Sequence, residues 1–246
     1  MKPRVRSLYY YSWTVKSFFR TIRRVKSYEE ACGLAKALDV LGERWTLLVI
    51  RQLMFGPQRF TDLEAGLPGV PPSLLSSRLK ELGDAGLVGK RTLPPPAAST
   101  VYELSDAGRE LECSIVSLAR WGGRFGPPVT EEDIVNAQCM ALGLRWLFRP
   151  EAAKHVRATY ELRAFGNVVS AVVDRGRIDV SVGPADAPDL AIEVLDRAVA
   201  RAMSTGGMPA SDAKMSEHVV LEGSEDALED FLKIFAMDPV PTPARA

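Results

Sequence analysis

The sequence predicts an α+β fold in two parts: a mainly helical domain with one β-hairpin, then an α+β domain whose antiparallel-rich sheet is packed by helices. Helical spacing of apolar residues dominates residues 27–126. In residues 127–238, runs that alternate apolar and polar residues are separate from helical runs. The 46% hydrophobic and 25% charged residues are ordinary for a globular protein, and 246 residues suffice for one or two domains.

Charge divides the chain into three zones, although the net charge is zero. Residues 1–26 contain eight Lys or Arg and no acid, residues 27–126 carry 11 bases and 12 acids, and residues 127–246 carry 12 bases and 19 acids. The overall charge is therefore no test of nucleic-acid binding. The basic, aromatic residues 1–26 are expected to form a flexible arm. It either follows DNA phosphates or a membrane surface, or is an extension from a start site placed too early.

The mainly helical domain shows helical spacing interrupted by turn residues. Residues 28–42 place small and apolar side chains on one face, and residues 44–56 are apolar on all sides, as in a central buried helix. Thr61 is expected to cap a short helix. The tripeptide Pro94–Pro96 separates two strand-like runs, which indicates a hairpin with a stiff tip. The expected helices span 28–42, 44–56, 60–67, 73–86 and 105–123, and the expected strands span 87–93 and 100–104.

The second domain is expected to begin after the linker GPPVTEED. Ile178, Val180 and Val182 alternate with polar residues, so one face of a sheet is predicted to be buried. The expected strands span 159–165, 168–174, 177–183, 189–195 and 218–223, and the expected helices span 133–148, 196–204 and 224–235. A loose, Pro-containing tail is expected over residues 239–246.

Composition and motifs argue against several classes of protein. Three scattered cysteines without a CxxC pair suit a reducing cytoplasm, and the two histidines lack zinc-ligand spacing, so no metal or cofactor is expected. No stretch approaches the roughly 18 apolar residues of a spanning helix, and no membrane association is expected. The chain contains no GxSxG, P-loop, HExxH or GxGxxG motif, so an enzyme is not expected.

The stretch PPSLLSSRLKELGDAGLV, residues 71–88, combines a buried stripe with an unusual exposed face. Leu75, Leu79 and Leu82 lie at i, i+4 and i+7 of the predicted helix. The other face carries small hydroxyl side chains beside one base: Ser73, Ser76, Ser77 and Lys80. A helix that enters the DNA major groove needs slim side chains that can reach base edges. The alternative is an ordinary solvated face on a helical scaffold.

The element order in residues 45–104 is helix, short helix, tight turn, helix and hairpin, which is the order of a helix-turn-helix with a wing. Four more basic residues are placed to reach DNA phosphates or the minor groove. Arg78 lies at the edge of the leucine stripe, Arg59 opens the short helix, and two lie on the hairpin: Lys90 and Arg91.

Residues 28–124 resemble the HxlR-type winged helix-turn-helix regulators of bacteria, because LGERW, RFTDL, LLSSRLKEL and YELSDAG occur in that family's order and spacing. The resemblance implies a cytoplasmic homodimer that binds a pseudo-palindromic operator in double-stranded DNA. It further implies a dimer interface built from residues 29–41 and 106–121.

Many members of the family carry a cysteine at the start of the first helix, and Cys32 stands there, followed by Gly33 where proline is usual. The resemblance implies that Cys32 is a redox sensor, since a helix N-terminus lowers a thiol pKa. The alternative is a small packing residue, the role expected of Cys113 and Cys139.

Residues 130–236 resemble the sterol-carrier-protein-like domain that some actinobacterial members append, on their element order and on YELR, DLAIEV and VVLEGSEDALEDFLKIF. This resemblance implies a pocket for a small apolar effector, lipid-like or aromatic; the alternative is a domain that only strengthens dimerisation. For the whole chain, the alternative to a regulator is a carrier of lipids or small apolar ligands in which the helix-turn-helix is only a scaffold.

Overall fold

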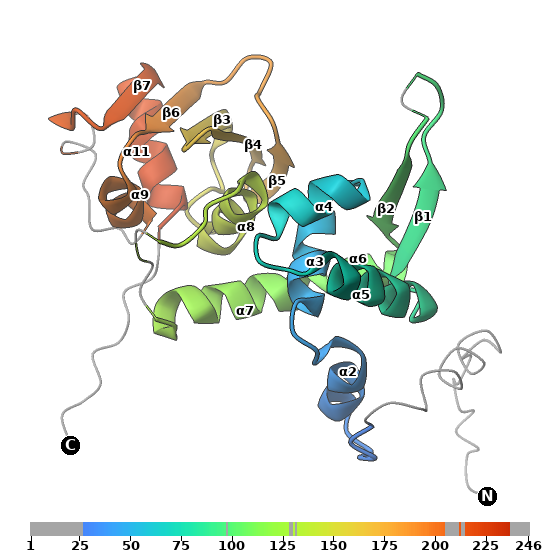
Figure 1. Ribbon diagram of the computed structural model, residues 1–246. Coiled ribbons are helices and arrows are strands. Elements are labelled where there is room, and N and C mark those ends of the chain that lie inside the picture. The colour runs from blue at the N-terminus through green and yellow to red at the C-terminus, as the bar shows by residue number, and fades with distance from the viewer. Residues whose placement is uncertain are drawn as a thin grey trace, which may run out of the picture. The chain divides into compact units, whose positions relative to one another are not determined.

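A computed structural model describes residues 27–96, 98–127, 130, 132–204, 212 and 215–236, with side chains up to residue 200 and again at 212 and 215–236 (Figure 1). The predicted arm 1–26 and tail 239–246 lie outside the described residues. The chain divides into two compact units, one ending at Glu110 and one beginning at Leu111. The predicted boundary was 126/127. The division falls earlier because the helix that follows Leu111 packs within the second unit.

The N-terminal unit has the expected element order, and its fold is mainly helical with one hairpin. Its core is the set of apolar side chains that the helical periodicity places inward, among them Ile50, Leu63, Leu75 and Leu82, each at most 1% exposed. The described elements are α2 (Gly33–Leu41), α3 (Thr46–Leu53), α4 (Phe60–Gly66), α5 (Pro72–Asp84), β1 (Val88–Thr92), β2 (Thr100–Leu104) and α6 (Asp106–Arg109).

Two local expectations of the sequence are wrong. Thr61 is not an N-cap: the cap of α4 is Arg59, whose backbone N–H donates to the Asp62 carboxylate at 3.0 Å. The predicted helix 105–123 is divided, because α6 ends at Arg109 and the next helix begins at Glu112. Ser105 caps only the short α6, accepting from Gly108 N–H at 3.1 Å. At Gly108, a Cβ would lie 2.3 Å from the Leu87 carbonyl oxygen, so this turn of the YELSDAG motif requires glycine.

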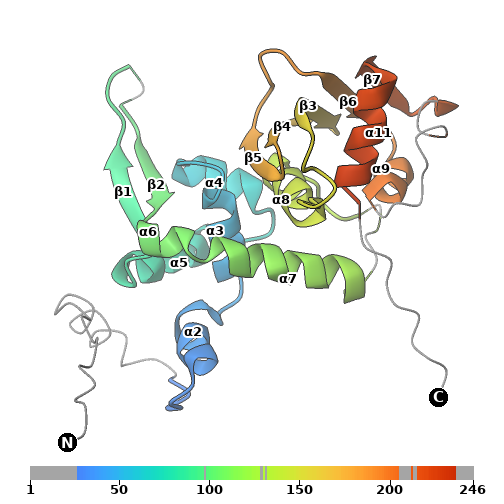
Figure 2. The ribbon, with the colours of Figure 1, turned by 180° about the vertical axis from the view of Figure 1, so that it is seen from behind.

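The strands β1 and β2 form an antiparallel hairpin that projects beyond α3, α4 and α5 (Figure 2). Its base is tied to the segment before α4. Gln58 N–H donates to the Tyr102 carbonyl at 3.0 Å, and Tyr102 N–H donates back at 2.7 Å. The Gln58 side chain donates to the Gln52 carbonyl at 2.6 Å, which links this segment to buried α3. The hairpin is therefore fixed at its root by backbone hydrogen bonds.

The C-terminal unit is an α+β structure with a five-stranded sheet in the order β5-β4-β3-β6-β7. Only β3 and β6 pair in parallel; the other neighbours are antiparallel. None of the described helices of either unit is long and apolar enough to cross a membrane. The elements are α7 (Glu112–Phe125), α8 (Ala137–Leu147), β3 (Arg157–Ala164), β4 (Asn167–Asp174), β5 (Arg177–Val182), β6 (Leu190–Val194), α9 (Arg197–Ser204), β7 (Val219–Gly223) and α11 (Glu225–Ile234).

One face of this sheet is apolar, but of the alternating residues predicted to be buried in β5 only Val180 is buried. Ile178 is partly exposed, and Val182, the last residue of this edge strand, is 40% exposed. Tyr160 of β3 pairs with Ala171 of β4 and with Leu190 of β6, and all three are at most 1% exposed. The Tyr160 ring makes edge contacts with Phe231 and Phe235, with centroids 5.4 and 5.8 Å away, which places α11 on this face. The helices thus bury the apolar side of the sheet.

Candidate nucleic-acid interface

The helix α5 is held in one rotational setting by its buried stripe. Pro72 occupies its first turn, where the missing N–H costs no intrahelical bond and the fixed φ suits a helix. Leu75, Leu79 and Leu82 are at most 3% exposed. Burying three leucines contributes roughly 5–9 kcal/mol of transfer free energy before entropic costs, enough to decide which face points outward. The positive φ of Gly86, +67°, then turns the chain into β1.

The outward face of α5 is the one predicted from the sequence. Ser73, Ser76, Ser77 and Lys80 are all exposed. Ser77 differs from the other two serines, because its hydroxyl donates to Glu81 Oε1 at 3.0 Å. The exposed ridge therefore consists of two slim hydroxyls, one hydroxyl engaged with a carboxylate, and one base.

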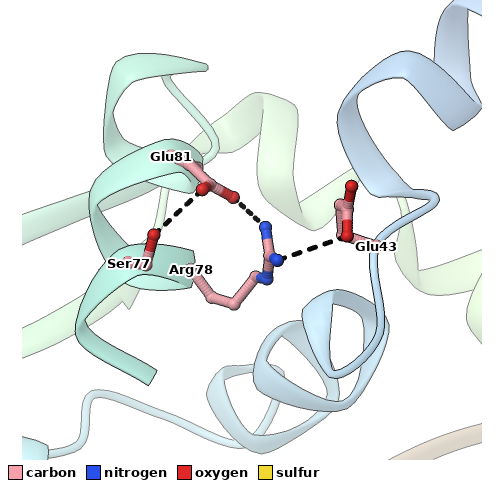
Figure 3. Close-up of polar contacts among 4 residues, drawn as sticks. All are labelled: Glu43, Ser77, Arg78 and Glu81. Carbon is pink, nitrogen blue, oxygen red and sulfur yellow. Dashed lines mark hydrogen bonds and ion pairs between the residues drawn. The ribbon is translucent and has the colours of Figure 1, made fainter. Parts of the chain in front are cut away.

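Arg78 is placed differently from the expectation that its side chain extends toward a phosphate. Its side chain is only 12% exposed and its guanidinium lies between two carboxylates (Figure 3). One terminal nitrogen pairs with Glu81, three residues on in α5, and the other lies 3.3 Å from Glu43 Oε2. Glu43 belongs to the turn between α2 and α3, so Arg78 connects that turn to α5.

Sequence reasoning missed these two carboxylates. The i, i+3 spacing of Arg78 and Glu81 was available as a signal, since such pairs face each other on a helix. Glu43 lies 35 residues from Arg78 in the chain, and no local pattern connects them.

The basic residues of the hairpin are exposed, but they also have partners within the hairpin. Arg91 forks onto the Glu103 carboxylate, with nitrogen–oxygen distances of 3.1–3.2 Å. The Lys90 ammonium lies 5.1 Å from the centre of the Tyr102 ring, directly across the strand pair. Arg59 is exposed at the start of α4. The structure thus brings Ser73, Ser76, Ser77 and Lys80 together on the exposed face of α5, with Arg78 at its less exposed edge. It places Arg59, Lys90 and Arg91 on separate elements.

Cys32 occupies the N-cap position of α2 and is exposed. The backbone N–H groups of Ala35 and Leu34 point to its sulfur and lower the pKa of the thiol. A thiolate is the reactive form of cysteine, so this position favours nucleophilic or redox chemistry. Cys113 is also exposed, and Cys139 is half-buried, so the expected packing role of Cys113 is not supported by burial.

The C-terminal unit contains an apolar cavity of about 180 Å³ between the sheet and its helices. Leu162 and Ala164 of β3 line it, together with Phe231 of α11 and Phe235, which follows the last residue of that helix. Its other lining residues are Val135, Met140, Gly143, Leu144, Leu147, Phe165, Val194 and Ala200. A cavity of this size with apolar walls suits a small apolar molecule. Within the part of the chain that the structure describes, no cluster of side chains could hold a metal ion.

Comparison with known proteins identifies similarity in the N-terminal part of the chain. A family model described as HxlR-like helix-turn-helix matches residues 40–130. The uncharacterized HTH-type transcriptional regulator Rv3095 of Mycobacterium tuberculosis is 39% identical over 105 residues, which are 41% of this chain and 66% of that protein. YvaP of Bacillus subtilis, another uncharacterized HTH-type transcriptional regulator, is 37% identical over 38% of this chain and 86% of its own length.

Two further similar proteins are named as regulators. The HTH-type transcriptional regulator YodB of Bacillus subtilis is 32% identical over 41% of this chain and 92% of its own length. Its solved reduced form gives a TM-score of 0.36 at 30% identity, covering 41% of this chain and all of that one. The solved reduced form of the redox regulator HypR gives a TM-score of 0.35 at 25% identity, covering 37% of this chain and 90% of that one.

Proposed function

The chain belongs to the HxlR-like helix-turn-helix family, and from this premise we propose that it regulates transcription as a cytoplasmic homodimer on a pseudo-palindromic operator in double-stranded DNA. The observation that carries the proposal is the exposed face of α5. Ser73, Ser76 and Lys80 form a low ridge that a major groove can accommodate, while the leucine stripe fixes the opposite side.

The remaining predicted contacts complete the proposed interface. Arg59, Lys90 and Arg91 are exposed and would meet phosphates, which positions a protein on DNA without reading sequence. Ser77 and Arg78 remain part of the proposed interface, although both side chains contact the Glu81 carboxylate. Arg78 would have to leave Glu43 or Glu81 to touch a phosphate, so a positioning role suits its geometry better.

Exposed apolar side chains support the homodimer. Leu34 of α2 is 68% exposed and Leu38 is 41% exposed. On α7, Leu118, Trp121 and Phe125 lie at i, i+3 and i+7 and are each more than half exposed. Large apolar side chains gathered on one helix face, rather than scattered, mark protein interfaces. Both helices are those that the family resemblance assigns to dimerisation.

The test is a fluorescence-anisotropy titration of the full chain with duplex DNA from upstream of its own gene and with a scrambled duplex. We expect the first duplex to bind at least about a thousandfold more tightly, with an affinity that falls steeply as salt rises. Lys80→Ala should weaken binding about tenfold, within the range of about 1–3 kcal/mol for a base contact. Lys233→Ala, an exposed lysine of α11, is the charge-matched control. Equal binding of both duplexes would contradict the proposal.

Regulation by thiol oxidation is proposed for Cys32, on its exposure and its lowered pKa. Treatment with peroxide or diamide should change the affinity of the wild-type protein for operator DNA and leave Cys32→Ser unaffected. If Cys32→Ser responds as the wild type does, the sensor is another residue.

The apolar cavity supports the proposal that the sterol-carrier-like C-terminal unit takes a small apolar effector, and it equally favours the second candidate function, a carrier. Gly143 lines the cavity, and an added Cβ there would meet nothing within 4 Å. Gly143→Leu should therefore fill the cavity and abolish uptake of a fluorescent fatty acid, while Gly143→Ala should retain it. A ligand that binds but does not alter DNA affinity would favour the carrier; uptake unchanged in Gly143→Leu would place the ligand elsewhere.

A further inference from the structure

A second cavity in the C-terminal unit, of about 270 Å³, has a chemical character opposite to that of the apolar one. It lies where α7 meets the end of α8 and shares only Leu147 with the apolar cavity. Three of its lining residues are arginines. The full lining is Arg120, Arg124, Trp146, Leu147, Phe148, Arg149, Pro150, Glu151 and Ala236.

The arginines are brought together by secondary structure. Arg120 and Arg124 lie four residues apart on α7 and therefore share a face. Arg149 follows α8, and its backbone N–H donates to the Ile234 carbonyl at 2.8 Å, which fixes its position beside α11. Helix α7 packs tightly here, since a Cβ at Gly123 would lie 2.7 Å from the Trp146 ring. The cavity thus has walls anchored from three helices.

Hydrogen-bonding capacity remains in this cluster. Arg120 Nε donates to the Trp146 carbonyl oxygen at 3.1 Å, which orients the guanidinium but does not neutralise it. Arg124 Nε is buried and has no hydrogen-bond partner among the described residues. A buried donor on a charged group without an acceptor is costly, so an acceptor in the cavity would be favoured.

Basic side chains outnumber acidic ones among the described lining residues. Glu151 is the acidic one, and its carboxylate is paired with Lys154. Arg120, oriented by a carbonyl, and Arg124, whose Nε has no partner among the described residues, therefore make a site for an anion.

The other lining residues indicate which kind of anion would fit. Trp146, Leu147, Phe148, Pro150 and Ala236 are apolar or aromatic. The planar fork of a guanidinium matches a carboxylate with two parallel hydrogen bonds. We propose that this cavity binds a small organic carboxylate, with the carboxylate held by Arg120 and Arg124 and the apolar body against Trp146 and Phe148. The site does not depend on the proposed DNA-binding function.

The test is ligand-observed fluorine NMR of the full chain with 4-fluorobenzoate. We expect saturable binding, and we expect 4-fluorobenzamide, which is neutral and of the same shape, to bind about tenfold more weakly or worse. Arg124→Gln should weaken 4-fluorobenzoate binding about tenfold or more, and Arg124→Lys, which keeps the charge but loses the fork, should fall between. Arg177→Gln, an exposed arginine of β5 outside the cavity, is the matched control and should bind as the wild type does.

The proposal would be overturned by no saturable binding of 4-fluorobenzoate, by equal binding of acid and amide, or by an equal effect of Arg124→Gln and Arg177→Gln. A tighter fit of 4-fluorophenyl phosphate than of 4-fluorobenzoate would also overturn it, because the site would then select phosphates. Thermal unfolding of each variant shows whether it is folded, and Arg120→Gln repeats the test on the same helix if Arg124→Gln is not folded.

Discussion

The candidate functional residues are exposed in the N-terminal unit and line cavities in the C-terminal unit. In the N-terminal unit the leucine stripe of α5 is fully buried and the residues of interest stand outside it. In the C-terminal unit the residues of interest line two cavities, one apolar and one rich in arginine. The difference suits the ligands proposed for the two units: a groove of DNA must be entered by a convex element, whereas a small molecule must be enclosed. The C-terminal unit thus leaves space unfilled, whereas buried polar atoms without a hydrogen-bond partner among the described residues occur in both units, such as Gln52 Oε1 in one and the Tyr160 hydroxyl in the other.

The largest effect on stability is expected from truncating one buried side chain in the core of each unit. Leu75 of α5 and Ile192 of β6 are both 0% exposed, so Leu75→Ala and Ile192→Ala should each cost about 2–5 kcal/mol of unfolding free energy. Hydrogen exchange followed by mass spectrometry should show faster exchange in the unit that carries the substitution. If Leu75→Ala accelerates exchange in β3 and β6 as much as in α5, the two units unfold as one and the comparison fails.

The next effect concerns the buried hydroxyl of Tyr160, which has no hydrogen-bond partner among the described residues. Burial, with the nearby Asp230 and Asp189 carboxylates, raises the pKa of this phenol to about 12. Because the folded pKa lies above the unfolded one, the associated stability is present below pH 10 and is lost as the pH rises toward 12.

Tyr160→Phe should remove this loss, which is on the order of 2–3 kcal/mol. At pH 8 the two proteins should differ by no more than about 1 kcal/mol, since the hydroxyl lacks a partner. Denaturant titrations at pH 8 and pH 11.5 measure both differences. A gap between the two proteins that does not change with pH would mean that the hydroxyl is hydrated, and the contrast in packing between the units would weaken.

A smaller effect is expected at the ion pairs that join α5 to the α2–α3 turn. A double-mutant cycle of Glu43→Gln and Arg78→Gln should give a coupling free energy of about 0.5–1 kcal/mol, because the Glu43 carboxylate is half exposed. The same variants separate two roles for Arg78. If it positions α5, Glu43→Gln weakens DNA binding; if it contacts a phosphate, Glu43→Gln frees it and binding is unchanged or tighter.

The smallest effect is expected at Cys32, where the predicted change concerns the rate of a thiol reaction and not the stability of the fold. Since the backbone N–H groups of Ala35 and Leu34 lower the pKa of this thiol, its alkylation by iodoacetamide should reach half-maximal rate at a lower pH than that of glutathione. Mass spectrometry of the peptide that contains Cys32 measures the rate. A midpoint at or above that of glutathione would remove the basis for a sensor at this position.

Most elements could be predicted from the sequence because their determinants are local. The i, i+4, i+7 leucines located α5 to within a residue or two, and the alternation Leu190, Ile192, Val194 located β6, with all three side chains at most 3% exposed. Both patterns need only the neighbours of a residue to be known.

Features that depend on distant residues could not be predicted in this way. The parallel pairing of β3 with β6 joins strands separated by two others in the chain, so no turn signals its register. The Glu43 partner of Arg78 and the arginine cavity likewise bring together residues from separate elements. The division of the predicted helix 105–123, between Arg109 and Glu112, was likewise not predicted.

The internal pairing of Arg78 and Arg91 has a kinetic consequence. Both cations already face carboxylates, Glu43 and Glu81 in one case and Glu103 in the other, so they add little free positive charge to the surface around α5. Binding to random DNA is driven almost wholly by such charge. As far as the described residues go, the proposed interface should therefore dissociate quickly from non-specific duplex. A long residence time would then be expected only on the matched sequence.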